Sequence, residues 1–218
     1  MIWDWSFAAA ILPELLRATL VTLQATLYAS LTALIFGFVL ALLRRSGIRL
    51  IRWPTAAFIE VVRSTPLLLQ LYFIFFVLPQ YGLSLSPILA GTLGLGIHYA
   101  TYISEVYRAG IEDVPTGQWE AAKVLNLTMP RTWSSIIVPQ VITRIVPSLG
   151  NYVVQMFKAT AILEAITLVE LLGEANVIGA QSFRYLEPFT LVGLIFLALS
   201  YPAALGLRYL ERKLHVRH

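Results

Sequence analysis

One stretch of the chain, Ala18 to Leu43, runs for 26 residues without a charged side chain, and four arginines follow it within nine positions. A helix needs about 20 apolar residues to cross a membrane, so this stretch is long enough to cross with some tilt. Asp4 and Glu14 precede it, whereas a secretory signal carries basic residues before a shorter apolar run. We therefore predict a retained transmembrane helix at about residues 15–43.

The composition extends this interpretation to the whole chain. The 218 residues are 58% hydrophobic and 13% charged, with a mean hydropathy of +0.74, and soluble domains carry about twice that charged fraction. The sequence has no cysteine, no phosphate-binding loop of the form G-x-x-x-x-G-K-S/T, and no zinc-protease or serine-hydrolase motif. Disulfide, zinc-thiolate and motif-based hydrolytic functions therefore have no support, and the small net charge of +4 does not indicate a nucleic-acid surface.

Four further apolar segments follow the first. Residues 66–104 contain no Lys, Arg, Asp or Glu, but Pro79, Gly82 and Pro87 punctuate them and divide them between two spans. We predict an all-α integral membrane protein with a single domain, residues 1–218. Its five transmembrane helices are expected at about 15–43, 56–78, 86–107, 133–157 and 188–209, with a polar loop at about 108–131.

The basic residues predict an orientation for this arrangement. Eleven of the sixteen Lys and Arg residues lie in residues 44–52, in the loop 108–131 and after residue 207, three segments that five crossings place on one side. Because cytoplasmic loops are enriched in basic residues, the N-terminus is predicted to be periplasmic and the C-terminus cytoplasmic.

The fourth predicted span carries a stripe of polar residues. Arg144, Ser148, Asn151, Gln155 and Lys158 are spaced by four, three, four and three positions, which places them on one helical face. The stripe either lines a path for a polar solute or holds helices together by hydrogen bonds. We favour lining for its outer half, Asn151 to Lys158, and expect Arg144 to reach the cytoplasmic surface.

Other polar residues also lie within predicted spans. Glu105 and Arg108 are three positions apart and are expected to form a salt bridge, and His98 is interpreted as a hydrogen-bonded helix contact more readily than as a pathway residue. Pro66 either breaks the second span, exposing backbone groups, or marks a helix start. In the outer segment after the fourth span, Glu164, Glu170 and Glu174 are interpreted as a solvated face, with contact to a partner protein as the alternative.

The loop at 108–131 is expected to contain a short helix. Pro115 and Gly117 are followed by about eight good helix formers, and Asn126 tolerates the left-handed conformation that often ends a helix. Composition alone leaves two alternatives open, a surface helix that binds nothing and an element on which another protein docks, with Trp119 and Leu125 as apolar anchors.

This loop resembles a known motif. The stretch Gly117-Gln118-Trp119-Glu120-Ala121-Ala122, then Asn126, then Ile136-Ile137-Val138-Pro139-Gln140, resembles the E-A-A loop (E-A-A-x3-G-x9-I-x-L-P) of bacterial ABC importer permeases. Asn126 stands where the family has glycine, and Val138 where it has leucine. Three more stretches resemble the polar amino-acid subfamily, so that the resemblance covers about residues 15–212; they are residues 60–70, residues 102–111, and residues 147–151 leading to 158–162.

The resemblance implies a permease subunit of a type I ABC importer in the bacterial inner membrane, and not an enzyme. Its expected partners are a second permease subunit (identical or paralogous), an ABC ATPase dimer that binds ATP and Mg, and a periplasmic solute-binding protein, with no nucleic acid and no metal or cofactor on this chain. A stand-alone channel or secondary carrier for a small polar solute is the alternative. The residues expected to couple to the ATPase are Gly117, Glu120, Ala121, Ala122 and Asn126. Those expected along the substrate pathway are Arg63, Thr65, Pro66, Gln70, Asn151, Gln155, Lys158 and Thr160.

One departure from the subfamily bears on the solute. The chain reads Lys158-Ala159-Thr160-Ala161-Ile162 where the subfamily commonly reads K-D-T-S-L. An acidic side chain in a polar cavity can pair with a substrate ammonium group, and Ala159 lacks one. The hypothesis is therefore a polar amino acid or zwitterionic amino-acid derivative, such as ectoine or an opine, and not a cationic amino acid.

Overall fold

The computed structural model describes residues 3–215, and this part of the chain consists of helices joined by short turns, without a strand. Arg217, which was counted among the basic residues, lies outside the described residues. Short π-helical or 3-10 segments at Phe73–Val77, Leu78–Tyr81, Trp133–Ile137 and Thr160–Ile166 join some of the helices. The α-helices are α1 (Trp5–Arg44), α2 (Arg49–Ser64), α3 (Leu67–Tyr72), α4 (Pro87–Glu112), α5 (Thr116–Val124), α6 (Met129–Thr132), α7 (Val138–Ala159), α8 (Leu171–Ser182) and α9 (Leu186–His215).

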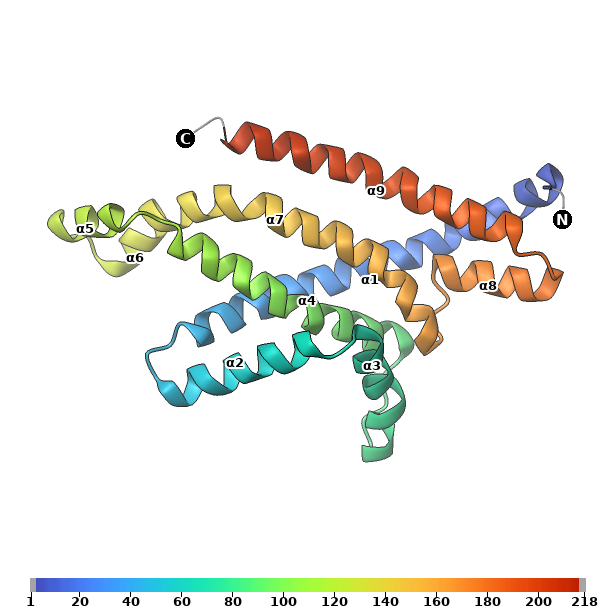
Figure 1. Ribbon diagram of the computed structural model, residues 1–218, viewed down its shortest axis with the longest axis horizontal. Coiled ribbons are helices and arrows are strands. Elements are labelled where there is room, and N and C mark those ends of the chain that lie inside the picture. Colours follow the sequence, from blue (N-terminus) through green and yellow to red (C-terminus); the bar gives the residue numbers. More distant parts are fainter. Residues whose placement is uncertain (1–2, 216–218) are drawn as a thin grey trace.

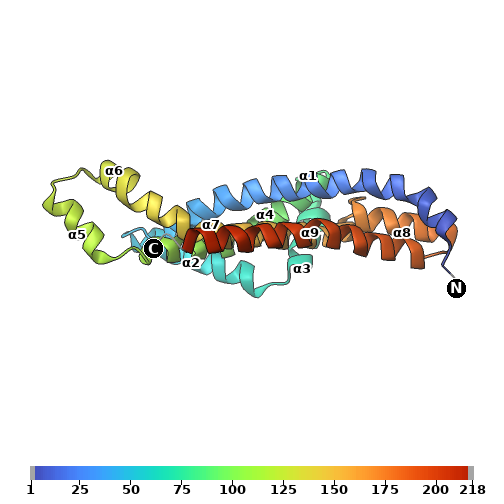
Figure 2. The ribbon, with the colours of Figure 1, turned by 90° about the horizontal axis from the view of Figure 1, so that it is seen from above.

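The long helices give the molecule an elongated shape with two distinct ends. The helices α1, α4, α7 and α9 run lengthwise, while α5 and α6 project at one end and α8 lies at the other (Figures 1 and 2). We call the first the α5 end, which includes the turn between α1 and α2, and the second the Asp4 end, which includes the starts of α1 and α9. Helix α1 begins at the Asp4 end and α9 runs back toward the α5 end, so the chain traverses the long axis an odd number of times.

The main packing seam joins α1 to α4 and is built from small residues. Ala25, Ala29 and Ala33 of α1 are fully buried in the core. A Cβ atom on Gly96 of α4 would lie 2.6 Å from the Cβ atom of Thr32. Because lipid supplies no hydrophobic force between helices, such close backbone approach supplies the van der Waals contact that holds them together.

The helices differ from the predicted spans in two places. Helix α1 starts at Trp5, ten residues before the predicted span, with Pro13 inside it. The predicted second span is not one straight helix, because α2 and the segment after it meet at a bend of 105°. By length and apolar composition, α1 and α9 qualify as membrane-crossing helices among the described residues, and the bent pair qualifies as a third. Helices α4 and α7, with 26 and 22 residues, reach roughly 30 Å or more, and the count of five spans stays a prediction.

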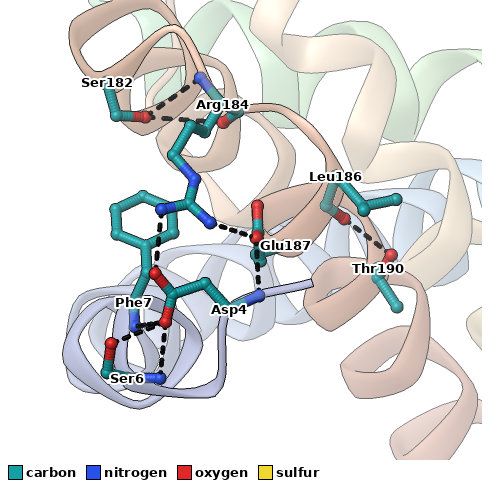
Figure 3. Close-up of polar contacts among 8 residues, drawn as sticks. All are labelled: Asp4, Ser6, Phe7, Ser182, Arg184, Leu186, Glu187 and Thr190. Carbon is teal, nitrogen blue, oxygen red and sulfur yellow. Dashed lines mark hydrogen bonds and ion pairs between the residues drawn. The ribbon is translucent and has the colours of Figure 1, made fainter. Parts of the chain in front are cut away.

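A cluster of charged groups closes the Asp4 end (Figure 3). The Arg184 guanidinium donates to the Asp4 carboxylate at 3.1 Å and to Glu187 at 2.6 Å, and it lies 4.6 Å from the centre of the Phe7 ring. Asp4 also caps α1, accepting the backbone N–H of Ser6 at 2.9 Å. These contacts tie the start of α1 to the turn between α8 and α9, some 180 residues later.

Hydrogen bonding sets the charge state of this cap. The hydroxyl of Ser6, then the backbone N–H of Phe7, and then the Arg184 guanidinium hold the pKa of Asp4 far below its ordinary value of 3.8. Asp4 therefore stays ionised under all mild conditions, and its negative charge lies at the N-terminus of a helix, where the helix dipole stabilises it.

The outer segment corrects one expectation. Glu170 is fully buried, and its carboxylate accepts the backbone N–H groups of Leu172 and Gly173, both at 2.9 Å, as the N-cap of α8. It is therefore neither a solvated residue nor a surface contact for a partner. Glu164 is half-buried and accepts a hydrogen bond from the Asn176 amide, so it too has a partner within the chain.

Candidate functional site

A cavity of about 630 Å³ opens between α2, α4 and α7. These helices correspond to the second, third and fourth predicted spans, and the second and fourth carry residues expected along the pathway. The polar and aromatic side chains of its lining come from all three helices and from the end of α4; they are Arg63, Tyr102, Glu105, Asp113, Arg144, Ser148 and Tyr152.

Arg63 is the cation that α2 contributes to this cavity. Its guanidinium donates to the backbone carbonyl of Thr101 and lies 4.9 Å from the centre of the Tyr102 ring, a cation–π contact. Its Nε atom is buried and has no hydrogen-bond partner among residues 3–215. No carboxylate of the described chain forms an ion pair with it. Arg63 therefore keeps an uncompensated charge and an unused donor.

The break beside Arg63 is held by a glutamine. Helix α2 ends at Ser64, and Pro66 is the N-cap of α3, so the proline both ends one helix and starts another. The amide of Gln70 donates to the carbonyls of Val62 at 2.6 Å and Thr65 at 3.0 Å, which the interrupted helix leaves without N–H partners. The predicted pathway residue Gln70 thus stabilises the break, and Thr65 and Pro66 are exposed at it.

An aromatic cluster borders the cavity. The rings of His98, Tyr99 and Tyr102 contact one another, and Tyr152 contacts both tyrosines, with ring centroids 5.4 to 6.3 Å apart. Nδ1 of His98 lies 3.2 Å from Oε1 of Gln70, so the interpretation of His98 as a hydrogen-bonded helix contact is confirmed. Sequence reasoning missed Tyr99 and Tyr152; their positions, next to polar residues on two facing helices, are the signal that could have found them.

Paired charges border the cavity toward the α5 end. The predicted pair is confirmed, with Arg108 2.7 Å from Glu105, and Arg44 of α1 binds the same carboxylate. Arg144 reaches the carboxylate of the exposed Asp113 at 2.6 Å. No group of three or more potential metal ligands gathers anywhere in residues 3–215.

The polar stripe of α7 lies mostly on an open face. Ser148, Asn151, Gln155 and Lys158 are exposed in the single chain, while the opposite face of α7 packs into the core. Ser148 lines the cavity, and the other three continue toward the Asp4 end. Thr160 differs from the expectation: it is fully buried in the 3-10 segment and donates to the Phe157 carbonyl at 2.7 Å. It does not belong to the exposed face.

The expected loop helix is present as α5, and it ends as its sequence predicts. Asn126 has a φ of 49°, in the left-handed region. The N–H of Leu127 bonds to the carbonyl of Ala122, and the N–H of Asn126 to that of Lys123, each at 3.0 Å. These two bonds form a Schellman motif, in which asparagine takes the place of the usual glycine.

The side chains of α5 divide into two faces. Trp119 packs edge-on against Trp133, with ring centres 5.5 Å apart, and Ala122 is only 2% exposed, so both face the rest of the chain. Glu120 and Ala121 are exposed, and so are Val124 at 82% and Leu125 at 67%. Of the two predicted apolar anchors, Leu125 alone is available to a partner. Gly117 lies in open space within the first turn.

Comparison with known proteins adds independent information. The family model described as "Binding-protein-dependent transport system inner membrane component" matches residues 7–216. A probable amino-acid ABC transporter permease, y4tG of Sinorhizobium fredii, is 45% identical over 98% of this chain and 93% of its own. The arginine transport system permease ArtQ of Bacillus subtilis is 32% identical over 97% of each chain. A crystal structure of an amino acid ABC transporter with histidines contains a chain that superposes with a TM-score of 0.91, at 33% identity, covering 98% of this chain and 100% of that one.

Proposed function

The chain belongs to the family of binding-protein-dependent transport system inner membrane components, as an amino-acid ABC transporter permease subunit, and from this premise we propose how it works. The permease is not itself an enzyme, because in such transporters a separate subunit hydrolyses ATP. This membership sets aside a stand-alone channel or carrier. The proposal is that solute delivered by a periplasmic binding protein crosses through the cavity between α2, α4 and α7.

The observation that carries this proposal is the unpaired charge of Arg63. Glu105 and Asp113 in the same lining are neutralised by Arg44, Arg108 and Arg144, whereas Arg63 has no carboxylate partner in the described chain. Amino acids and their derivatives carry a carboxylate, and a guanidinium binds carboxylates with strong charge-assisted hydrogen bonds. Arg63 is therefore proposed to bind the solute carboxylate.

The exposed stripe of α7 supports a second permease subunit. The side chains of Asn151, Gln155 and Lys158 have no hydrogen-bond partner within the described chain, and polar groups are costly at bilayer depth unless they face protein or water. The proposal is that a second permease, identical or paralogous, covers this face, and that the three side chains line the path between the subunits. The buried Thr160 is left out of the lining.

Helix α5 is proposed to receive the ATPase. The helix lies at the tip of the molecule, beyond the ends of α1 and α2 (Figure 1). The helix and its C-cap expose Glu120, Ala121, Val124 and Leu125. ATP and Mg are assigned to a pair of ATPase subunits. Because α5 lies between α4 and α7 along the chain, closure of these subunits is proposed to push α5 and, through it, α4 and α7. The α5 end is proposed to be cytoplasmic, in agreement with the basic residues concentrated there.

The solute is proposed to be a polar amino acid or zwitterionic derivative, of which ectoine and an opine are examples. The argument is that Ala159, next to Lys158, supplies no carboxylate to pair with a substrate side-chain cation. ArtQ, at 32% identity, is named for arginine. Competition between arginine and a zwitterionic solute for uptake therefore tests this assignment. Selective, strong uptake of arginine or lysine would contradict this assignment.

The test of the pathway is transport by the reconstituted complex in proteoliposomes, with its binding protein and labelled solute. Arg63→Gln should lower uptake by about tenfold or more, since a charge-assisted hydrogen bond contributes roughly 1.5–3 kcal/mol. Arg63→Lys should retain part of the activity. Arg17→Gln removes an equal charge from an exposed position of α1 and is the matched control. Wild-type uptake by Arg63→Gln would refute the proposed carboxylate site.

A further inference from the structure

The turn between α1 and α2 carries a concentration of arginines, of which the transport proposal uses only Arg44, as a partner of Glu105. We call Arg44, Arg45, Arg49 and Arg52 the basic turn. A cavity of about 780 Å³ lies among three of them, and its lining also includes Trp53, Ala56, Arg108 and Glu112. A second hollow of about 670 Å³ adjoins it, sharing Arg52 and Trp53 and lined also by Arg49, Leu50 and Pro54.

Most of the positive charge of the basic turn is not balanced within the chain. Arg44 and Arg108 share the carboxylate of Glu105, and Arg108 also reaches Glu112 at 2.5 Å. Arg45, Arg49 and Arg52 form no ion pair with any residue between 3 and 215. Five arginines therefore line these two hollows. Only two carboxylates of the described chain, those of Glu105 and Glu112, pair with any of them, and both bind Arg108 or Arg44.

The arginines of the basic turn lie at the start of α2, where positive charge is electrostatically unfavourable unless an anion binds. Helix α2 begins at Arg49, its N-cap Ile48 offers no side-chain acceptor, and its first turn contains no acidic residue. The N-terminus of a helix carries a partial positive charge and exposes unbonded N–H groups. Arginines placed there repel that charge, whereas an anion placed there is stabilised by both the arginines and the N–H groups.

The location indicates which anion is available. The basic turn directly follows the long apolar α1, and Trp53, 70% exposed, is of the residue type enriched at membrane–water interfaces. Exposed apolar side chains of α1 and α2, including Leu42, Leu43 and Leu50, lie next to the arginines along the chain. Helix α5 projects well past this turn along the long axis (Figure 1), which places the turn nearer the bilayer than the ATPase-docking surface.

We propose that the basic turn binds the phosphate group of an anionic phospholipid, with the acyl chains lying along the apolar surface of α1. Pockets of basic residues next to transmembrane helices are suited to such headgroups, and each arginine near an anionic surface strengthens the attraction. The site is separate from the solute cavity, so it does not depend on the proposed function of Arg63. The lipid would fix the depth of α2, whose far end carries Arg63.

The test uses the whole complex, with its ATPase, purified in detergent and examined by native mass spectrometry during titration with phosphatidylglycerol or phosphatidylcholine. The wild type should retain phosphatidylglycerol in preference to phosphatidylcholine. The triple variant Arg45→Gln, Arg49→Gln, Arg52→Gln should bind phosphatidylglycerol at least about tenfold more weakly. The matched control removes three charges from the last turns of α9, by Arg208→Gln, Arg212→Gln and Lys213→Gln, and should bind as the wild type does.

Three results would overturn the proposal. One is equal retention of phosphatidylglycerol by the wild type and the triple variant. Another is full displacement of the lipid by an equal concentration of inorganic phosphate, which would make the site a free-phosphate site. A third is loss of ATPase copurification in the triple variant but not in the α9 control, which would make the turn a protein-docking surface. The single variant Arg45→Gln provides a milder test if the triple variant fails to fold, and a partial loss of affinity is expected for it.

Discussion

The two ends of the molecule differ in how many of their arginines are left without an ion pair. At the Asp4 end, Arg184 is bound by Asp4 and Glu187, and the three groups close the chain on itself. At the α5 end, Arg45 and Arg49 form no ion pair in the described chain. The comparison separates charges that hold the fold from charges that are left for other molecules.

The same contrast holds for apolar groups. Near the Asp4 end, Leu15, Leu171 and Ala175 form a fully buried cluster between α1 and α8. At the α5 end, Val124 and Leu125 are largely exposed on a short helix that touches little else. An exposed apolar patch of this kind beside exposed polar residues is typical of a protein–protein surface. Changes at the Asp4 end should therefore affect stability, and changes at the α5 end should affect assembly and transport.

The largest expected effect on stability comes from removing Arg184. The variant Arg184→Gln leaves Asp4 and Glu187 without their shared partner, and the side chain of Glu187 is only 2% exposed. We expect a clear fall in the apparent Tm of the purified complex, with uptake per folded complex unchanged. Arg17→Gln, at an exposed position of α1, is the control and should leave the Tm as it is. Equal Tm values for the two variants would show that the cluster does not hold the fold.

A pH series isolates the charge of the cap within this cluster. The pKa of Asp4 is lowered on folding, so its contribution to stability is present above the unfolded value of about 3.8 and is lost as the pH falls toward the folded value. Asp4→Asn keeps a capping oxygen but not the charge. It should lower the Tm at pH 7, and the difference from the wild type should shrink as the pH falls below about 4. A Tm difference between Asp4→Asn and the wild type that does not change with pH would contradict a stabilising role of the Asp4 charge.

The smallest effect is expected at the end of α5. Because Asn126 adopts a φ of 49°, Asn126→Gly should preserve both the Schellman motif and uptake. Asn126→Val should destabilise the folded conformation of this turn by about 1–2 kcal/mol, since a β-branched residue is strained in the left-handed region. Uptake by the two variants, measured side by side, checks this. Impaired uptake by the glycine variant would mean that the asparagine side chain itself contacts a partner.

Local spacing predicted the features that depend on a single helix. The pairing of Glu105 with Arg108, the exposed polar face of α7 and the positive φ of Asn126 all follow from helix periodicity and capping. Features that depend on how helices cross could not be predicted in this way. Arg44 reaches Glu105 across the α1–α4 seam, a partnership that no sequence spacing encodes.

Two other differences have local physical causes. Thr160 was expected along the substrate pathway, but α7 ends at Ala159 and the following 3-10 segment turns the side chain into the core. Ala122 was expected to face the ATPase, but Trp119 packs on Trp133 and thereby turns Ala122 toward the permease. In both places a change of helix type or a tertiary contact determines which way the side chain faces.

The central claim is that the α5 end transmits ATP-driven motion from a separate subunit, and Glu120 tests it most directly. The measurement compares wild-type and Glu120→Lys complexes for ATPase copurification and for ATP hydrolysis stimulated by the binding protein with solute. Because Glu120 is exposed and α5 keeps its internal bonds, the permease should fold with an unchanged Tm. The account predicts that the variant loses the ATPase or its stimulation. Normal copurification together with normal stimulated hydrolysis would contradict it.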